Sequence, residues 1–495
     1  MSTIIIKDLS FNYPGGDPLF SSLSLNIDTS WKLGLVGRNG RGKTTLLRLL
    51  EGTLEHTGSI ITPFPLPYFP PELPNEGLNA LELTLALRPD NGLLEWKLKR
   101  EADFLKLPEN TLKRPIGELS GGERVKVLLS ILFTEDEVFP LIDEPVRNLD
   151  REGRIVVARY LSLKKGFILV SHDRELLDGA VDHIISLNPE GAELCRGNFS
   201  VWWENREREE KRRELNALML KKDIKRLEEA AQKSSDWAKS TEKGKYGKGP
   251  VNRGFIGHKA AKMQKKSKNI TRRREKAVEE RREIVKTEKK SSELSLKPLI
   301  FEGGVIARAT SLSAGYDEKP VLTDLSFTIN QGDRLALKGP NGSGKSLLMK
   351  LLMGEGRIIA GELKVSKRAI VSFVPQNPDA TTLNLREMAK ERGLDEGRFK
   401  SLLRLLGFTR EALNSDFSSL SLGQRKKAYL AASILTEAHL YLWDEPLANV
   451  DIISRMEIEN LLTKSKITLV VCEHDFTFLE KVATSFISLA GPNKS

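Results

Sequence analysis

The sequence predicts an α/β protein with two similar domains, each built on a parallel sheet, joined by a long antiparallel α-helical hairpin. Three observations support this prediction. Four short motifs occur twice in the same order, at an offset of about 300 residues. In each copy a short apolar run leads into a glycine-rich turn and then into a helix-forming stretch. Between the copies lie roughly 100 residues that are highly charged and favour helix.

The repeated motifs divide the chain. Residues 37–44 (GRNGRGKT) recur at 339–346 (GPNGSGKS), and residues 119–123 (LSGGE) recur at 420–424 (LSLGQ). Residues 141–145 (LIDEP) recur at 442–446 (LWDEP), and residues 171–173 (SHD) recur at 473–475 (EHD). We therefore predict domains over residues 1–200 and 299–495, with a linker over residues 201–298.

Composition narrows the class of protein. Of 495 residues, 39% are hydrophobic and 29% are charged, which is typical of a folded domain protein. No stretch approaches the ~18 apolar residues that a membrane helix needs, and the N-terminus lacks the pattern of a signal peptide. The sequence therefore predicts a cytoplasmic protein with no membrane attachment. Its two cysteines, Cys195 and Cys472, lack metal-ligand spacing.

The glycine-rich turns predict phosphate binding. Backbone N–H groups can close around phosphate oxygens only where side chains are absent, and the helix that follows adds its positive dipole end. A lysine would reach the β- and γ-phosphates, and the next hydroxyl would ligate Mg²⁺. The predicted ATP-binding residues are Gly37, Asn39, Gly40, Gly42, Lys43, Thr44 and Thr45 in the first copy, and Gly339, Asn341, Gly342, Gly344, Lys345 and Ser346 in the second.

Acidic residues and histidines follow later strands in both copies. Asp143 and Asp444 end apolar runs, from which a carboxylate can hold the Mg²⁺ shell. The acidic residue that follows each of these aspartates is predicted to polarise the attacking water. One histidine in each copy is predicted to contact the γ-phosphate. A surface acidic pair or a structural histidine would be the better interpretation of a single occurrence. The repeat favours catalysis, by Glu144, Glu445, His172 and His474.

At residues 119–123 the sequence resembles the signature motif of ATP-binding cassettes, and residues 420–424 resemble a variant of it. The resemblance implies two P-loop NTPase domains with two ATP sites between them, each capped by the other domain's signature. The signature residues implied are Ser120, Gly121, Gly122, Ser421 and Gly423. It also implies that Tyr13 and Tyr316 stack on adenine; a tyrosine that only fills the core is the alternative.

The linker predicts contact with a polyanion. Residues 201–300 contain 30 Lys and Arg against 16 Asp and Glu, and residues 231–270 contain 11 against 2. Apolar residues at helical spacing on either side of a glycine-rich turn predict a hairpin of two helices, each of about 35 to 40 residues. A solvated coiled coil is the plain alternative. The predicted nucleic-acid-contacting tip comprises Trp237, Lys243, Lys245, Tyr246, Lys248, Arg253, Phe255, Lys259 and Lys262.

Two such domains around a basic helical linker resemble the ABC-F ATPases of translation, and most of all the Lsa-type antibiotic-resistance members. The matching passages are residues 31–48, 139–145, 166–174, 197–200 and 422–427. The resemblance implies a monomer with paired cassettes that binds the bacterial 70S ribosome, its rRNA and P-site tRNA, and uses ATP with Mg²⁺. It would displace lincosamides, pleuromutilins and streptogramin A. The alternatives are a housekeeping translation factor, the ATPase subunit of a membrane transporter and, more distantly, a DNA-maintenance ATPase.

Two departures from that family concern the first site. The loop at 146–148 reads Val-Arg-Asn in place of the expected small polar residues. Pro71 occupies the position of a glutamine that would assist Mg²⁺ or water, whereas the second copy keeps Gln376. These departures predict that the first site is slower than the second.

Overall fold

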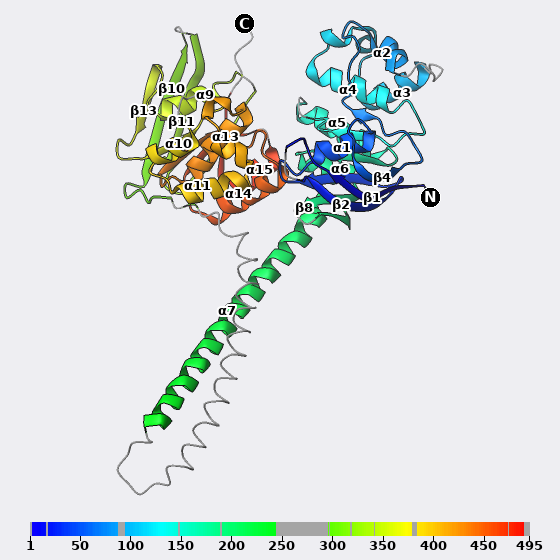
Figure 1. Cartoon of the computed structure of the whole chain (residues 1–495). Helices are drawn as coiled ribbons and strands as arrows, with labels where there is room; N and C mark the ends of the chain where they lie inside the picture. Colours follow the sequence, from blue (N-terminus) through cyan, green and yellow to red (C-terminus); the bar gives the residue numbers. More distant parts are fainter. Residues whose placement is uncertain are drawn as a thin grey trace, which may run out of the picture. The chain divides into compact units, whose positions relative to one another are not determined.

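The computed structural model describes residues 2–15, 18–87, 95–146, 149–188, 191–243, 296, 298–316, 319–340, 342–378, 384–473 and 475–489. The chain forms two compact units. One consists of residues 1–200 and 294–495, and the other of residues 201–293. The first unit contains both copies of the repeat, called here the first half (residues 1–200) and the second half (residues 294–495). Figure 1 traces the chain by colour.

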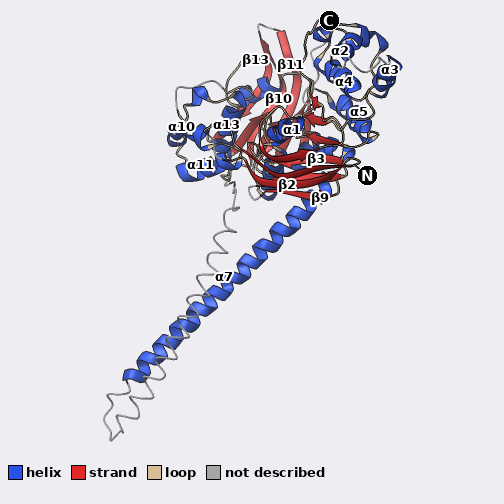
Figure 2. Cartoon of the chain, turned by 45° about the vertical axis from the view of Figure 1, so that its right-hand side comes forward, coloured by secondary structure: helices blue, strands red, loops and turns tan. Residues whose placement is uncertain are grey.

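Each half is built on two sheets (Figure 2). In the first half, a three-stranded antiparallel sheet has the order β2-β1-β4, and a six-stranded sheet has the order β5-β6-β7-β3-β8-β9. All neighbouring pairs of the larger sheet are parallel except β8 with β9. The strands are β1 (Thr3–Phe11), β2 (Phe20–Asp28), β3 (Lys32–Gly37), β4 (Thr57–Ile61), β5 (Tyr68–Phe69), β6 (Leu141–Asp143), β7 (Phe167–Val170), β8 (His183–Asn188) and β9 (Gly191–Arg196).

The second half repeats this plan. Its antiparallel sheet has the order β11-β10-β13, and its five-stranded sheet, β14-β15-β16-β12-β17, is parallel throughout. The strands are β10 (Val305–Tyr316), β11 (Lys319–Asn330), β12 (Arg334–Lys338), β13 (Ile358–Val365), β14 (Val371–Val374), β15 (Leu440–Asp444), β16 (Leu469–Cys472) and β17 (Ser485–Ser488).

Helices follow the parallel strands in both halves. The first half contains α1 (Lys43–Glu51), α2 (Ala80–Leu87), α3 (Glu95–Phe104), α4 (Gly121–Leu132), α5 (Arg151–Ser162) and α6 (Arg174–Ala180). The second contains α9 (Lys345–Leu352), α10 (Leu385–Glu391), α11 (Glu396–Leu405), α12 (Arg410–Asn414), α13 (Leu422–Leu435), α14 (Ile452–Lys464) and α15 (Phe476–Val482).

The predicted motifs begin several of these helices. The hydroxyl oxygen of Ser120 accepts a hydrogen bond from the backbone N of Glu123, whose carboxylate accepts one from the backbone N of Ser120. Ser421 and Gln424 form the same reciprocal cap at α13. Such a capping box satisfies two N–H groups that a helix start leaves open. The signature residues are therefore held at helix N-termini, with their backbone N–H groups in a fixed direction.

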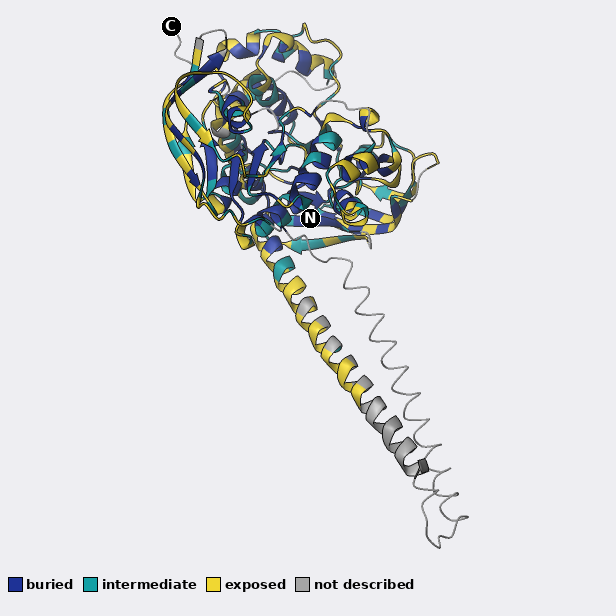
Figure 3. Cartoon of the chain, turned by 90° about the vertical axis from the view of Figure 1, so that its left-hand side faces the viewer, coloured by how far each residue is buried: buried dark blue, intermediate teal, exposed yellow. Residues whose placement is uncertain are grey.

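The core joins the first helix of each half to both of its sheets. In the first half, apolar residues of β1, β3, β7, β8 and α1 belong to one buried cluster. In the second half, β10, β12, β15, β16 and α9 share the corresponding cluster. Figure 3 colours buried residues dark blue, and these residues gather in the interior of both halves. Strands β3 and β12 are buried on both faces of the parallel sheets, so packing fixes their positions. Each glycine-rich turn begins where one of these two strands ends.

Helix α7 (Phe199–Lys243) is 45 residues long, longer than the 35 to 40 residues that the sequence predicts. The helix begins at Phe199, before the predicted start of the linker at residue 201. There Phe199 is buried, and Asp178 accepts hydrogen bonds from the backbone N (2.7 Å) and hydroxyl (2.5 Å) of Ser200. The described helix ends at Lys243, where the predicted glycine-rich turn (residues 242–254) begins. The rest of that turn and the predicted second helix lie outside the described residues.

Candidate ATP sites

The first glycine-rich turn runs from the end of β3 to the start of α1. Gly40 and Gly42 adopt φ values of 78° and 82°, in the left-handed region that favours glycine. The Lys43 ammonium donates hydrogen bonds to the carbonyl oxygens of Gly37 (2.8 Å) and Arg38 (3.3 Å). Burial lowers the pKa of Lys43. The ammonium is thus folded back over its own turn, so it can reach a phosphate held by that turn.

A hydroxyl and a carboxylate meet beside this turn. The Thr44 hydroxyl donates a hydrogen bond of 2.7 Å to Oδ2 of Asp143, at the end of β6. The Tyr68 hydroxyl donates a second, of 3.0 Å, to the same oxygen. Burial and the charge of Asp143 raise the pKa of Tyr68, so it stays a neutral donor. Tyr68 was not predicted as a site residue.

These oxygens fit Mg²⁺. Magnesium prefers hard oxygen ligands and is held in nucleotide sites by one or two protein oxygens together with substrate phosphates. Thr44 and Asp143 supply such a pair, and the second half supplies the equivalent contact between Ser346 and Asp444. In the described part of the chain no group of three or more His, Cys, Asp and Glu residues could hold a metal unaided.

Glu144 lies one residue beyond the end of β6. Its φ is 50°, a left-handed conformation that is rare for residues other than glycine, and its backbone N donates to the carbonyl of Val170 (2.9 Å). Its Oε1 is 3.4 Å from Nε2 of His172. Burial, and next the neighbouring charge of Asp143, raise the pKa of Glu144 to about 7. Two predicted catalytic residues are thus in contact.

The second glycine-rich turn has the same geometry. Gly342 and Gly344 have φ values of 80° and 89°. The Lys345 ammonium donates hydrogen bonds to the carbonyl oxygens of Gly339 (2.9 Å) and Pro340 (2.8 Å). Asp444, at the end of β15, is 3% exposed, and burial raises its pKa although the hydrogen bond to Ser346 opposes this effect. The repeat therefore extends to the contacts of the side chains.

The two predicted catalytic glutamates differ in their partners. Glu445 shares the left-handed backbone, with a φ of 48°, and its backbone N donates to the carbonyl of Cys472 (2.9 Å). The Gln376 amide donates a 2.7 Å hydrogen bond to Oε1 of Glu445, and the Lys426 ammonium is 4.0 Å from Oε2. The first site has Pro71 where the second has this glutamine, and proline has no side-chain donor.

Tyr13 lies close to the first site. Its hydroxyl is 3.0 Å from that of Thr45, on α1, and its ring packs edge-on against Phe11. The side chain is 49% exposed, so it does not fill the core. An exposed ring held beside the first turn of α1 suits stacking on a base.

The sequence profile of the ABC transporter family matches residues 20–147 and 322–448, which contain both glycine-rich turns, both signatures and both acidic motifs. The chain belongs to the ABC transporter family. Its two halves are ATP-binding cassettes, and the chain is an ATPase. In the described part of the chain, no helix combines the length and apolar character needed to cross a membrane.

Relatives match along nearly the whole chain. The ribosome protection protein VmlR of Bacillus subtilis (strain 168) is 27% identical over 477 residues, covering 94% of this chain and 83% of VmlR. The energy-dependent translational throttle protein EttA of Escherichia coli (strain K12) is 26% identical over 530 residues, covering 96% and 90%. These matches, with two cassettes in one chain, place the protein in the ABC-F group.

Solved structures agree on the fold. The archaeal ribosome recycling factor aABCE1, in a complex with the ribosomal stalk protein aP1, has a TM-score of 0.57 at 20% identity, covering 97% of this chain and 87% of that one. The RNase-L inhibitor gives a TM-score of 0.56 at 20% identity, with the same coverage. The predicted fold class, two P-loop NTPase cassettes of α/β type, is confirmed.

The glycine-rich turn of the first cassette also contacts the second cassette. The Arg38 guanidinium forms an ion pair of 2.5 Å with Glu457 and a 3.0 Å hydrogen bond to the carbonyl of Leu405. The backbone N of Asn39 donates to Asp451 (3.2 Å), and its amide donates to the carbonyl of Asn449 (3.0 Å). Arg38 was not predicted as a site residue, because its neighbours belong to the other cassette.

The structure thus brings together part of the predicted first composite site. Asn449 accepts from Asn39, and a Cβ placed on Gly423 would lie 3.2 Å from the Asn449 amide, so the second signature is close to the first turn. Among the described residues, no hydrogen bond or ion pair joins Ser120–Gly122 to the second turn. That pairing stays a prediction.

For several predicted site residues the structure gives no side-chain position. Asn341 and His474 lie outside the described residues, as does most of the tip: Lys245, Tyr246, Lys248, Arg253, Phe255, Lys259 and Lys262. Trp237 and Lys243 are in α7 and Tyr316 is in β10, but their side chains are outside the description. Their roles stay predictions.

Proposed function

We propose that this protein is a ribosome-bound ATPase that protects bacterial ribosomes from lincosamides, pleuromutilins and streptogramin A. The observation that carries the proposal is the near full-length match to VmlR and EttA, whose names tie them to ribosome protection and to translation. The match includes the linker and not the cassettes alone. Residues 231–270 would enter the ribosome and contact rRNA and P-site tRNA.

The charge of the linker supports this partner. Residues 201–300 contain 30 basic and 16 acidic side chains, so the excess positive charge of the chain is concentrated there. Lysine and arginine neutralise phosphates, and each contact made releases counterions, so binding should weaken as salt rises. A ribosome is the polyanion that the relatives' names indicate.

ATP would control binding and release. In each site the lysine and the glycine-rich turn would hold the phosphates, while Thr44 with Asp143, and Ser346 with Asp444, would hold Mg²⁺. A bound Mg²⁺ would offset the charge that develops on the transferred phosphoryl group. Glu144 and Glu445 would orient the attacking water, and a histidine in each cassette would contact the γ-phosphate. Hydrolysis would then release a monomeric protein from the ribosome.

A housekeeping translation factor is the second candidate, because the match to EttA covers as much of the chain as the match to VmlR. Both candidates require ribosome binding and differ in the effect of drugs. A susceptible strain that expresses the chain should survive several-fold higher concentrations of the three drug classes under the first proposal. Unchanged susceptibility with altered translation would favour the second.

Ribosome co-sedimentation of the Glu144→Gln/Glu445→Gln double variant tests the shared part. The variant should pellet with 70S particles in ATP and not in ADP, and less of it should pellet as salt rises. Protein that stays in the supernatant at low salt with ATP would refute ribosome binding. Recovery with membranes would then indicate a transporter subunit.

A further inference from the structure

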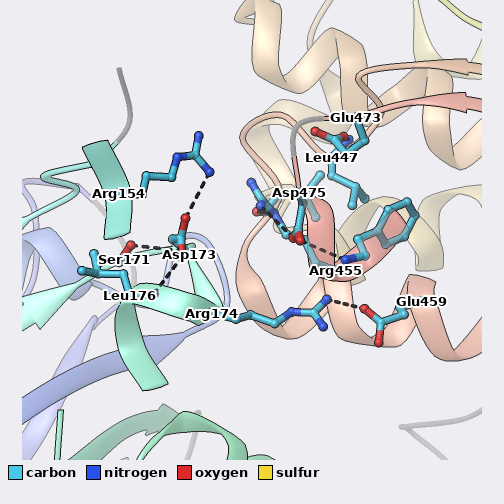
Figure 4. Close-up of polar contacts among 12 residues, drawn as sticks. Arg154, Ser171, Asp173, Arg174, Leu176, Leu447, Arg455, Glu459, Glu473 and Asp475 are labelled. Carbon is cyan, nitrogen blue, oxygen red and sulfur yellow. Dashed lines mark hydrogen bonds and ion pairs between the residues drawn. The ribbon is translucent and has the colours of Figure 1, made fainter. Parts of the chain in front are cut away.

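An arginine occurs at the same repeat position on α5 and α14 and makes the same contacts in each cassette (Figure 4). Arg154 donates through Nε to the carbonyl of Leu149 (3.0 Å), and its Nη1 bonds to Asp173 (3.0 Å). Arg455 donates through Nε to the carbonyl of Val450 (2.9 Å), and its Nη1 is 3.7 Å from Asp475.

These arginines tie two functional loops together in each cassette. Asp173 follows His172 directly and caps α6, and Asp475 holds the equivalent place before α15. The carbonyls belong to the loop that precedes the caps of α5 and α14, Asp150 and Asp451. In the second cassette that loop contacts the first glycine-rich turn through Asp451 and Asn39. A shift at the histidine can therefore reach the loop that faces the other site.

A buried ion pair joins the cassettes at the same place. Arg174, the residue after Asp173, pairs through Nη2 with Oε2 of Glu459 on α14 (Figure 4). The two side chains are 6% and 3% exposed. Glu459 lies four residues after Arg455, so both project from one side of α14. Oε1 of Glu459 also contacts the Lys481 ammonium, of the same cassette, at 3.1 Å.

The residues at the equivalent repeat positions cannot form the same ion pair. The residue at the repeat position of Arg174 is Phe476, and that at the position of Glu459 is Ala158. Among the described residues, Nε and Nη1 of Arg174 have no hydrogen-bond partner, so the guanidinium is held through one nitrogen. Removing either partner of a buried ion pair leaves the other charge buried and unpaired, so the two side chains are held together. The pair can therefore transmit movement between the elements it joins.

We propose that Arg174 is a positioning residue that couples the two ATP sites through Glu459. When the γ-phosphate leaves the first site, His172 and the adjoining start of α6 move. Arg174 passes this movement to α14, whose Arg455 pairs with Asp475, the residue that follows the predicted catalytic histidine of the second cassette in the sequence. Turnover at the second site thus depends on what the first site holds. The inference rests on the roles proposed for the two histidines and not on ribosome binding.

The test compares turnover at the second site with the first site filled or impaired, without ribosomes. In Glu144→Gln protein the first site holds ATP that it does not hydrolyse, and in Lys43→Met protein it loses its phosphate-binding ammonium. Both kcat and KM are measured in each protein, and the ratio of the two kcat values measures the coupling. With Arg174 present we expect this ratio to differ from one by at least threefold, with KM changing less than kcat.

The Arg174→Met substitution should bring this ratio to one, Glu459→Gln should do the same, and Arg174→Lys should retain part of the coupling. Lys481→Met removes only the partner of Glu459 within its own cassette, so it should leave the ratio unchanged and serves as the matched control. A structural role alone would lower the melting temperature and slow both backgrounds alike, leaving the ratio as it was.

Two results would overturn the proposal: a kcat ratio that Arg174→Met leaves unchanged, or a kcat ratio of one while Arg174 is still present. Because no ribosome is present, either result would leave the proposed ribosome function to its own test.

Discussion

The buried carboxyl of Glu144 should make the nucleotide-free protein less stable at neutral pH than it would be with an uncharged residue there. Burial and the adjacent charge of Asp143 raise its pKa from 4.5 to about 7. Replacing Glu144 with Gln keeps the size and removes the charge. We therefore expect Glu144→Gln to raise the thermal stability of the protein in EDTA without nucleotide.

The sign and size follow from proton linkage. The pKa in the folded protein is above the unfolded value, so the folded state holds its proton more tightly between pH 4.5 and about 7. Stability is therefore lost as pH rises through that window, and the penalty is complete above it. At about 1.4 kcal/mol per pKa unit, the difference between 4.5 and about 7 gives an upper value of about 3.5 kcal/mol. Relaxation around the charge should leave about 1–3 kcal/mol.

Thermal melts between pH 5 and pH 8.5 measure the effect. For a domain of this size each kcal/mol is worth about 2–4 °C, so Glu144→Gln should melt roughly 3–10 °C higher at pH 8. The gain should shrink toward pH 5. Glu445→Gln is the matched control, because Glu445 accepts a hydrogen bond from Gln376 and should gain nothing from losing its charge. A gain at residue 144 that is the same at every pH would refute the reasoning.

Three further predictions concern the first cassette. In a Glu445→Gln background, Pro71→Gln should raise the remaining turnover several-fold by restoring an amide near the attacking water; a Pro71→Ala control should not, and no rise with Gln would contradict the proposed asymmetry. Tyr68→Phe in the same background should raise the Mg²⁺ concentration for half-maximal activity a few-fold, because Asp143 loses a donor; an unchanged Mg²⁺ dependence would exclude this role. Glu101→Ala should cost about 3–5 kcal/mol of stability, measured by urea unfolding, because Glu101 accepts from the partly buried Lys164 ammonium and is the nearer of two acceptors of the buried Tyr160 hydroxyl; a loss below about 1 kcal/mol would contradict it.

Local chemistry explains why much of the site could be predicted from sequence. A glycine-rich turn between a buried strand and a helix has few conformations that place its N–H groups together, and Gly40, Gly42, Gly342 and Gly344 all have the left-handed φ values that favour glycine. The contact between Thr44 and Asp143 also follows from motif order, because parallel strands end at the same edge of the sheet. The helix after each signature follows from its capping box.

Contacts between distant residues could not be predicted in this way. Nothing near Tyr68 in the sequence indicates that its hydroxyl reaches Asp143, because that contact requires β5 to pair with β6. The length of α7 was underestimated because Asp178, far from the linker in sequence, binds its first turn.

By itself, the sequence determined the two cassettes, their glycine-rich turns and the basic linker, because each depends on residues that are close together or repeated in register. Only the tertiary structure decided how the cassettes meet. Arg38 and Arg174 carry no motif of their own, and their partners Glu457 and Glu459 lie in the other cassette. Such pairings depend on which surfaces the folded cassettes bring together, and no local pattern in the chain records that.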